Sequence, residues 1–261
     1  MATLTTEKLS IGYGEALIVN DLNIDIPANQ ITTIIGPNGC GKSTILKTIS
    51  RLHPSKKGKV YLDGKAIHRT PTRKIANKLA ILPQSPLAPD GLTVEELVSY
   101  GRSPRQTGFG RLKPHDWDMI EWALEVTGMS SFQGREVDSL SGGQRQRVWI
   151  AMALAQETEL LLMDEPTTYL DMAHQLDILQ LLEKLNREEN RTVVLVLHDL
   201  NHAARFAHYM IALNNGRVIK EGSPEQLMTS ETLKDVFQID AEIIEDPRTR
   251  KPVCVTYDTI K

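Results

Sequence analysis

Cysteine is scarce in this sequence, because the 261 residues include only Cys40 and Cys254. Two cysteines cannot build the disulfide framework of a small secreted domain, and neither stands in the CxxC spacing of a zinc site. We therefore expect two reduced thiols and a cytoplasmic chain.

Long apolar runs are also missing. The longest purely apolar stretches, such as residues 193–197, fall far short of the roughly 20 residues that a bilayer-spanning helix needs. The first residues, MATLTTEKLSIGYG, lack the basic region and the apolar stretch of a signal peptide. We therefore expect that, if this protein works at a membrane, another chain crosses it.

Neither sign of charge is in excess. Lys and Arg total 30 while Asp and Glu total 33, which gives a formal net charge of −3. Such a balance produces no global positive field that would attract nucleic acid or acidic lipid. Hydrophobic residues make up 41% and charged residues 24% of the chain, which is typical of a folded globular protein. We expect a folded chain with no nucleic-acid partner.

What the sequence does contain is an alternation of strand and helix patterns. Residues 3–36 have β character, and an apolar run at 31–35 leads through a glycine-rich loop into a helical pattern at 43–52. Later strands are expected at 60–62, 79–82, 160–163, 192–197 and on both sides of Asn215-Gly216, and later helices at 173–189 and about 201–207. Strands that alternate with helices of this size predict βαβ units around a mostly parallel sheet, and therefore an α/β fold.

Between residues 89 and 158 the pattern becomes helical, and we interpret this region as a helical subdomain inserted into the α/β core. Helices are predicted at 94–100, 117–126 and 143–156. Residues 101–114, rich in Pro, Gly and Arg, are predicted to be a surface loop. Residues 230–261 are expected to form a helix and short β-like pieces.

A glycine-rich motif lies between the strand at 31–35 and the helix that follows it. Its nine residues are Gly36, Pro37, Asn38, Gly39, Cys40, Gly41, Lys42, Ser43 and Thr44. They fit G-x-x-x-x-G-K-[ST], the P-loop pattern, in the strand–loop–helix context that this pattern requires. Inward-pointing N–H groups and the helix N-terminus make a cradle for β and γ phosphates. Lys42 supplies a positive charge to those phosphates, and the Ser43 hydroxyl can ligate Mg²⁺.

Two acidic residues follow the apolar strand at 160–163. In an open α/β sheet the ligand crevice lies at the carboxyl ends of the strands. Asp164 is therefore expected to hold Mg²⁺ directly or through water, and Glu165 to polarise the attacking water. A solvated acidic turn is the simpler alternative, and the P-loop in the same chain favours the catalytic interpretation.

The segment LSGGQ at residues 140–144 precedes a predicted helix, where a serine N-cap is its simplest interpretation. Together with the P-loop and Asp164-Glu165, it resembles the ATP-binding cassette ATPases, the motor subunits of ABC transporters. The resemblance covers about residues 3–240. In that family the signature motif contacts the γ-phosphate of ATP held by the opposite subunit, and here it would consist of Ser141, Gly142, Gly143 and Gln144.

The resemblance also implies an architecture: a P-loop NTPase core with a mostly parallel sheet, an N-terminal antiparallel β subdomain and an inserted helical subdomain. Residues 1–261 would form a single nucleotide-binding domain, with the helical subdomain at about 89–158.

Four further positions match the family pattern one at a time. Tyr13 matches the aromatic residue that stacks on adenine, and Gln84 the glutamine that reaches Mg²⁺ and the catalytic water. His198 matches the switch histidine near the γ-phosphate, and Asp171 lies in the segment that joins one ATP site to the other. A core or surface tyrosine and a structural histidine at a strand end are the simpler alternatives. No motif of the ATP site is broken, so the resemblance implies hydrolysis of ATP with Mg²⁺.

Partners follow from the same resemblance. The family implies a homodimer that sandwiches two ATP molecules and is bound to transmembrane permease subunits. The protein would be peripheral, at the cytoplasmic face of the cell membrane, with a permease docked near Gln84 and residues 85–87. A substrate-binding protein would take part indirectly.

Several stretches are most similar to the subunits that power the uptake of ferric siderophores. They are YGRSP at 100–104, LAQET at 154–158, DEPTTYLD at 164–171 with AHQ at 173–175, and HDLNHAAR at 198–205. Haem and cobalamin importers are near relatives, and they remain alternatives for the cargo. A non-transport ABC ATPase on ribosomes or DNA and a module that uses ATP only to dimerise are alternatives of other classes. The chain has neither two cassettes nor a long coiled coil, which disfavours the first, and Glu165 and His198 disfavour the second.

Overall fold

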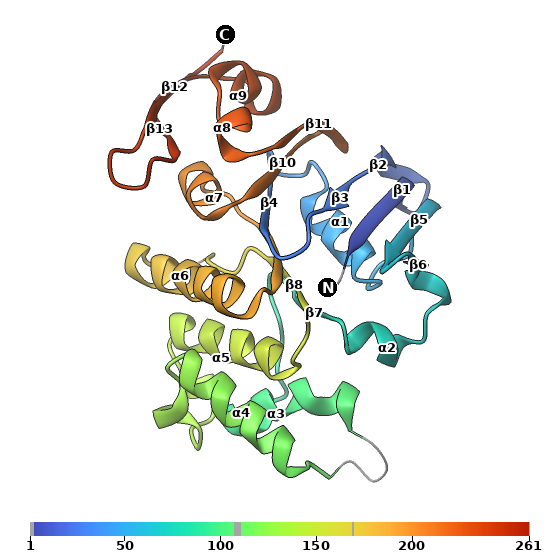
Figure 1. Cartoon of the computed structure of the whole chain (residues 1–261), viewed down its shortest axis with the longest axis vertical. Helices are drawn as coiled ribbons and strands as arrows, with labels where there is room; N and C mark the ends of the chain where they lie inside the picture. The colour runs from blue at the N-terminus through green and yellow to red at the C-terminus, as the bar shows by residue number, and fades with distance from the viewer. Residues whose placement is uncertain (1–2, 107–110, 169, 261) are drawn as a thin grey trace. The chain divides into compact units, whose positions relative to one another are not determined.

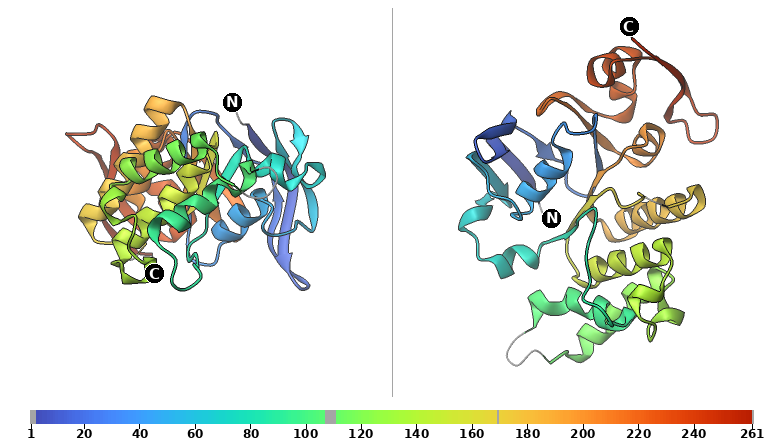
Figure 2. Two further views of the ribbon diagram at one scale, coloured as in Figure 1. Left: turned by 90° about the horizontal axis from the view of Figure 1, so that it is seen from below. Right: turned by 180° about the vertical axis from the view of Figure 1, so that it is seen from behind.

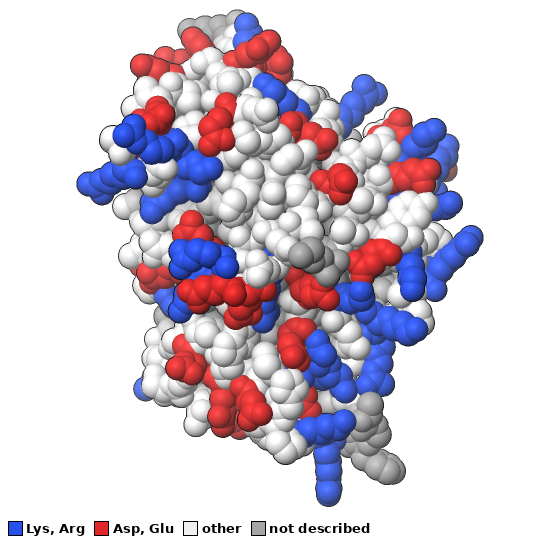
Figure 3. All heavy atoms as spheres, viewed as in Figure 1, with Lys and Arg blue, Asp and Glu red and all other residues white. Residues whose placement is uncertain are grey.

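The computed structural model describes residues 3–106, 111–168 and 170–260, and the chain folds into two compact units (Figure 1). The first unit comprises Met1–Arg69 and Thr192–Lys261, and the second comprises Thr70–Arg191. Acidic and basic side chains are interspersed over most of the face seen in Figure 3, as the nearly balanced counts of the two signs predict. Among the described residues, no helix is both long enough and apolar enough to cross a bilayer.

The first unit begins with an antiparallel sheet. Its strands, in spatial order, are β2 (Ala16–Leu22), β1 (Leu4–Tyr13), β5 (Lys57–Leu62) and β6 (Lys65–Ala66), with β3 (Asp25–Ile26) also paired to β1. Asp63 and Gly64 join β5 to β6 with φ values of 52° and 70°. Two successive left-handed residues make the tight hairpin that an Asp-Gly pair predicts. The expected N-terminal antiparallel β subdomain is therefore confirmed.

Four further strands of the first unit form a second sheet. Its order is β11 (Arg217–Gly222), β10 (Tyr209–Asn214), β4 (Ile31–Ile35) and β9 (Thr192–Val196). β10, β4 and β9 are parallel, and β11 is antiparallel to β10. Every residue of β4 and β9 is buried, which explains why both are continuous, mostly apolar runs in the sequence.

Helices follow the carboxyl ends of these strands. α1 (Lys42–Ile49) follows β4, and α7 (Leu200–Phe206) follows β9. α1 ends before the predicted residue 52, because Arg51 takes a left-handed φ of 68° that does not continue a helix. The unit closes with α8 (Pro224–Leu227), α9 (Ser230–Phe237) and the antiparallel hairpin of β12 (Ile239–Glu245) and β13 (Pro252–Thr259).

The second unit contains two parallel strands and most of the helices. The strands are β7 (Leu79–Leu82) and β8 (Leu160–Asp164). The helices are α2 (Thr72–Ala76), α3 (Val94–Ser99), α4 (Pro114–Val126), α5 (Gly142–Ala155) and α6 (Met172–Glu189). α3, α4 and α5 pack against one another (Figure 2), and α4 buries Ile120, Ala123 and Leu124. The extent of an inserted subdomain at about 89–158 within one domain stays a prediction.

The predicted surface loop at 101–114 is wrong in its first part. Tyr100–Arg105 form a 3-10 helix, and the Arg102 side chain is only 1% exposed. Its guanidinium donates to Asp116 Oδ1 at 2.8 Å and to Glu157 Oε2 at 3.0 Å. The sequence pattern indicates a loop because arginine is rarely buried, and here paired carboxylates compensate for the burial. Residues 107–110 lie outside the described residues.

The same ion pairs hold the carboxylates in their charged form. Burial by itself would raise the pKa of Asp116, but hydrogen bonds from the Lys113 amide and from Arg102 lower it overall. Arg102 also donates to the Ala155 carbonyl at the end of α5. One buried side chain therefore fastens the start of α4 and the end of α5 together.

Candidate functional site

The P-loop connects β4 to α1 within the first unit. The Lys42 side chain folds back over the loop, and its Nζ donates to the carbonyls of Gly36 at 2.8 Å and Pro37 at 2.9 Å. Lys42 is only 5% exposed, whereas Asn38 and Gly39 are exposed. The ammonium charge is thus fixed beside an open loop, where a phosphate group can replace the carbonyls as its partner.

Two glycines of this loop occupy positions that a larger residue would not tolerate. A Cβ at Gly36 would lie 2.2 Å from the Leu213 carbonyl oxygen of β10, and one at Gly41 would lie 2.9 Å from Val19 Cγ2. Gly41 also has a φ of 106°, which side-chain-bearing residues rarely adopt. The turn that brings backbone N–H groups to a phosphate therefore depends on these glycines.

Cys40 has a packing role in the loop. It is 4% exposed, and its carbonyl accepts a hydrogen bond of 3.1 Å from the Gly216 amide. Burial raises the pKa of the Cys40 thiol, and the nearby Lys42 charge offsets only part of this effect. The thiol is therefore a protonated packing group rather than a nucleophile.

Tyr13 lies at the end of β1, where half of its surface is exposed. Its ring is 4.5 Å from the His53 ring, with an angle of 45° between the planes. A His53 ring nitrogen lies 3.2 Å from the Gly12 carbonyl oxygen. The exposed tyrosine face suits a planar base, and His53, which the sequence did not indicate, supports it from the side. No local signal links His53 to Tyr13, because 40 residues separate them.

His198 follows β9 after one residue and is exposed. The next residue, Asp199, is the N-cap of α7 and accepts a hydrogen bond of 2.7 Å from the His202 amide. The imidazole therefore stands at a strand end, as predicted, beside a helix start that Asp199 fixes.

Gln84 and Glu165 meet within the second unit. Gln84 Nε2 donates to Glu165 Oε2 at 2.5 Å. The contact follows from the parallel register of β7 and β8, in which Leu82 lies opposite Met163. Gln84 and Glu165 each stand two residues beyond that pair, so both reach the same end of the strands.

The strand end also sets the surroundings of the two acids. Asp164 is 1% exposed and Glu165 is 7% exposed. Glu165 has a left-handed φ of 53°, an uncommon conformation that is found preferentially at functional sites. Thr168 Oγ1 donates to Glu165 Oε2 at 3.1 Å. Thr168 was not predicted as a site residue, although its spacing of three residues from Glu165 is a usable signal.

The signature segment begins α5 with a capping box. Ser141 Oγ accepts from the Gln144 amide at 3.3 Å, and the Ser141 amide donates to Gln144 Oε1 at 3.1 Å. Ser141 and Gly142 are exposed. A Cβ at Gly143 would lie 3.6 Å from the His174 ring of α6, so the starts of α5 and α6 are neighbours.

Asp171 is the N-cap of α6. Its carboxylate accepts from the His174 amide at 2.9 Å and lies 2.8 Å from His174 Nδ1. The backbone hydrogen bond from His174 and the contact with its ring lower the pKa of Asp171. Tyr169, in the same stretch, lies outside the described residues.

The residues predicted to hold the metal carry oxygen donors, which suit Mg²⁺ better than a transition metal. Gln84 and Asp164, in the second unit, offer amide and carboxylate oxygens, and Ser43, in the first unit, offers a hydroxyl oxygen. In the part of the chain that the structure describes, no group of three His, Cys, Asp or Glu side chains is placed to hold a metal. A Mg²⁺ ion that shares its coordination with nucleotide phosphates needs no such group.

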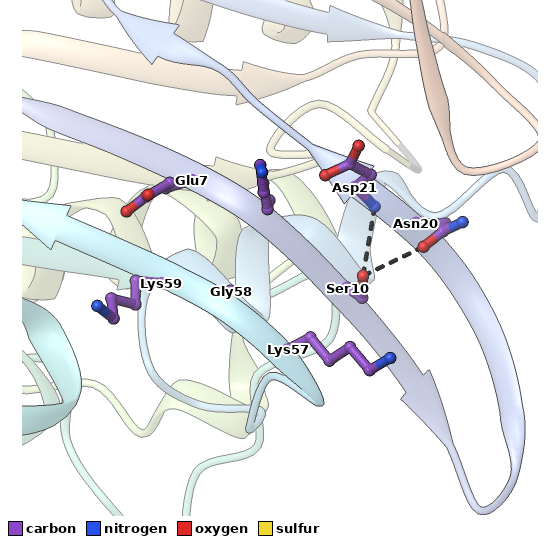
Figure 4. A pocket seen from close by; sticks show the side chains of 8 residues that line it. Glu7, Ser10, Asn20, Asp21, Lys57, Gly58 and Lys59 are labelled. Atoms are coloured by element: carbon purple, nitrogen blue, oxygen red, sulfur yellow. Dashed lines mark hydrogen bonds between the residues drawn. The ribbon is translucent and has the colours of Figure 1, made fainter.

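A hollow of 540 Å³ over the N-terminal sheet lies apart from these residues. It is lined by Glu7, Lys8, Ser10, Asn20, Asp21, Lys57, Gly58 and Lys59 (Figure 4). None of these was predicted as a site residue. Ser10 and Asn20 are hydrogen-bonded to each other at 3.2 Å, so part of the polar lining is already satisfied.

The predicted site residues thus fall into two sets, one in each unit. The first unit holds Tyr13, the P-loop and His198, and the second holds Gln84, Asp164, Glu165, the signature segment and Asp171.

Comparison with known proteins identifies the family. The family described as ABC transporter matches residues 19–168. The iron(3+)-hydroxamate import ATP-binding protein FhuC of Bacillus subtilis (strain 168) is 67% identical to this chain, over 100% of this chain and 97% of that protein. The ferric enterobactin transport ATP-binding protein FepC of Escherichia coli (strain K12) is 44% identical, over 98% and 94%.

Solved structures of similar fold also belong to ABC transporters. An inward-facing ABC transporter described as of the metal-chelate type superposes with a TM-score of 0.83 at 31% identity, covering 97% of this chain and 96% of that one. The dimeric structure of a bacterial ABC transporter cassette gives a TM-score of 0.76 at 31% identity, covering 84% and 98%. The P-loop, the signature segment and these likenesses together show that this chain belongs to the ABC transporter family, as an ATP-binding ATPase subunit.

Proposed function

We propose that this protein is the ATP-hydrolysing motor of an importer that takes up a ferric siderophore of the hydroxamate class through a separate membrane permease. The main support for this choice of cargo is the identity of 67% with the iron(3+)-hydroxamate import protein over the whole chain. Proteins named for siderophore and enterobactin transport follow at 49% and 44% identity. The ATPase itself contacts no cargo, so the cargo follows from these relatives and not from a pocket.

In this proposal the P-loop binds the β and γ phosphates while Tyr13 stacks on the adenine. The buried Lys42 ammonium exchanges the Gly36 and Pro37 carbonyls for phosphate oxygens. Its position beside the exposed part of the loop supports this exchange.

For hydrolysis, Glu165 polarises the attacking water. Gln84 and Thr168 orient the Glu165 carboxylate through the hydrogen bonds that they donate to it, and His198 contacts the γ-phosphate. Ser43, Gln84 and Asp164 would hold Mg²⁺, which neutralises charge that develops on the phosphates.

The exposed signature segment supports a dimer. Ser141, Gly142, Gly143 and Gln144 of one copy would contact the γ-phosphate bound by the other, and Asp171 would link the two sites. The dimeric cassette structure supports this arrangement. ATP binding would then shift the population from open to closed dimers, and hydrolysis would reset it.

A permease partner completes the proposal. The protein would be peripheral at the cytoplasmic face of the cell membrane, with the permease docked near Gln84 and residues 85–87. Leu87 is 92% exposed, which supports an apolar contact with another chain at this place. A substrate-binding protein would deliver the cargo on the opposite side.

Uptake of labelled cargo tests the proposal. A strain that lacks this protein is given either the parent or Glu165→Gln, and the uptake of ferric hydroxamate, ferric catecholate, haem and cobalamin is measured. We expect the parent alone to restore ferric hydroxamate uptake. Restoration of only haem or cobalamin uptake would overturn the cargo, and uptake restored equally by Glu165→Gln would overturn the coupling to hydrolysis.

A further inference from the structure

The C-terminal hairpin is bonded to the helix that follows His198. Asn201 Nδ2, on α7, donates to the Cys254 carbonyl of β13 at 3.1 Å, and the Cys254 amide donates to Asn201 Oδ1 at 2.8 Å. One side-chain amide therefore pairs both backbone groups of a residue on β13, as a neighbouring strand would. These two bonds are called the Asn201 bridge below.

The remainder of this contact is incompletely packed. A cavity of 380 Å³ lies beside the bridge, lined by residues 198–201 on one side and by Phe237, Ile239, Cys254 and Tyr257 on the other. Within the described residues, β12 and β13 pair with each other and with no other strand, and an isolated hairpin of two strands is marginally stable in water. The Asn201 bridge is therefore an important link between the hairpin and α7.

The opposite face of α7 is fixed to the sheet. Ala203, Ala204 and Phe206 are buried, and Thr33 Oγ1 of β4 donates to the Ala203 carbonyl at 3.3 Å. α7 is short, and the Asn201 bridge is a contact outside the helix that opposes a tilt of its N-terminal half. His198 lies three residues before Asn201, and any such tilt displaces its imidazole.

We propose that Asn201 is a positioning residue that, with the C-terminal hairpin, fixes the place of His198 for ATP hydrolysis. The inference rests on the proposed role of His198 at the γ-phosphate. Loss of the bridge leaves the P-loop and Tyr13 intact, so it lowers turnover without weakening ATP binding. A misplacement of about 1 Å in a reacting geometry can cost as much as 100-fold in rate, and we expect a loss of about tenfold here.

Two variants break the bridge from opposite sides. Asn201→Ala removes the side-chain amide, and Cys254→Pro removes the backbone N–H that donates to it. That N–H faces Asn201 rather than β12, and proline is tolerated at such an edge position. We expect both variants to lower kcat about tenfold with an unchanged KM for ATP, measured by phosphate release from the full chain.

Two matched control variants leave the Asn201 bridge intact. Cys254→Ala retains the N–H, and Ser230→Ala removes one hydrogen bond at the α9 end of β12, where Ser230 Oγ donates to the Ala241 carbonyl, while the bridge stays in place. Both are expected to show the parent kcat. Circular dichroism and thermal melting verify that each variant is folded, and if Cys254→Pro does not fold, Asn201→Ala with its controls carries the test.

His198→Ala separates this inference from the proposed function. If His198→Ala keeps the parent rate, the role of His198 fails and the inference fails with it. If His198→Ala abolishes turnover but Asn201→Ala has the parent kcat, only the positioning role is overturned. A raised KM with unchanged kcat in Asn201→Ala, or a kcat loss in Ser230→Ala equal to that in Asn201→Ala, also overturns it.

Discussion

The P-loop and the signature segment each contain glycines and begin a helix. They differ in how far their polar groups are buried and hydrogen-bonded within their own segment. In the P-loop, Lys42 is 5% exposed and bonded to two carbonyls of its own loop. In the signature segment, Ser141 and Gly142 are exposed, and the Ser141 hydroxyl and amide are bonded to Gln144 in a capping box. The first is a loop whose lysine is already held by its own carbonyls, whereas the second is an exposed helix start, which is what the proposed contact with a nucleotide on another copy requires.

Glu165→Gln has the largest expected effect on turnover, and it tests whether the second unit holds the chemistry. The amide keeps the shape of the side chain but cannot act as a base, so we expect phosphate release to fall by about 1,000-fold. ATP affinity, measured by equilibrium binding, should stay at the parent value, because the P-loop is intact. A parent rate of hydrolysis would remove Glu165 from the role of base.

Ser141→Arg tests whether the exposed segment needs a partner. A bulky cation at this helix start should block closure of the dimer and lower turnover by about 100-fold, the size expected for a lost anion-binding group. Ser141→Thr, which keeps the capping hydroxyl, is the matched control. Gel filtration with ATP should show dimers in the background of Glu165→Gln but not when Ser141→Arg is added. An unchanged dimer yield would contradict the shared site.

Lys42→Ala tests whether the P-loop lysine of the first unit binds the phosphates of ATP. Removal of a charge-assisted hydrogen bond to phosphate costs about 2–3 kcal/mol, so we expect the Kd for ATP to rise by roughly 30- to 150-fold. Cys40→Ser, in the same loop, preserves the ammonium and should bind ATP like the parent. Equal ATP affinity in Lys42→Ala and the parent would show that the loop does not hold the phosphates through this side chain.

Thr168→Val has the smallest expected effect on turnover. It tests whether the Thr168 hydroxyl helps to orient Glu165 in the second unit. It removes a hydroxyl that donates a hydrogen bond to the Glu165 carboxylate, 3.1 Å from Oε2. Glu165 keeps its hydrogen bond from Gln84, so we expect the change to cost about 1 kcal/mol, the typical net value of an intramolecular hydrogen bond, and kcat to fall about fivefold. Thr168→Ser, which retains the hydroxyl, should restore the parent rate, and a loss of equal size in both variants would assign Thr168 to packing instead.

Local sequence patterns were sufficient to predict the strands and the loop that position the site. The apolar runs at 31–35 and 160–163 are buried strands, and the P-loop stands between β4 and α1 as the spacing predicts. These features can be predicted because hydrophobic periodicity and glycine content report the surroundings of neighbouring residues. Arg102 shows the limit, because its polar segment predicts a loop while its side chain is buried against Asp116 and Glu157.

Contacts between distant residues could not be predicted in the same way. His53 lies beside Tyr13 across a separation of 40 residues, and Asn201 is bonded to Cys254 across 53. Neither pair has a periodic signal, because each depends on how whole strands and helices dock. The support that Thr168 gives to Glu165 is different, because the spacing of three residues between them is a usable signal in the sequence.

The sequence by itself determined the chemistry that is available: a phosphate loop with its lysine, two acids after an apolar strand, and an LSGGQ segment before a helix. Only the tertiary structure decided which side chains act together. The register of β7 and β8 brings Gln84 to Glu165, and the docking of the hairpin brings β13 to α7. The physical reason is that residue type fixes what a group can donate, accept or charge, whereas strand register and packing fix its distance from the group that it serves.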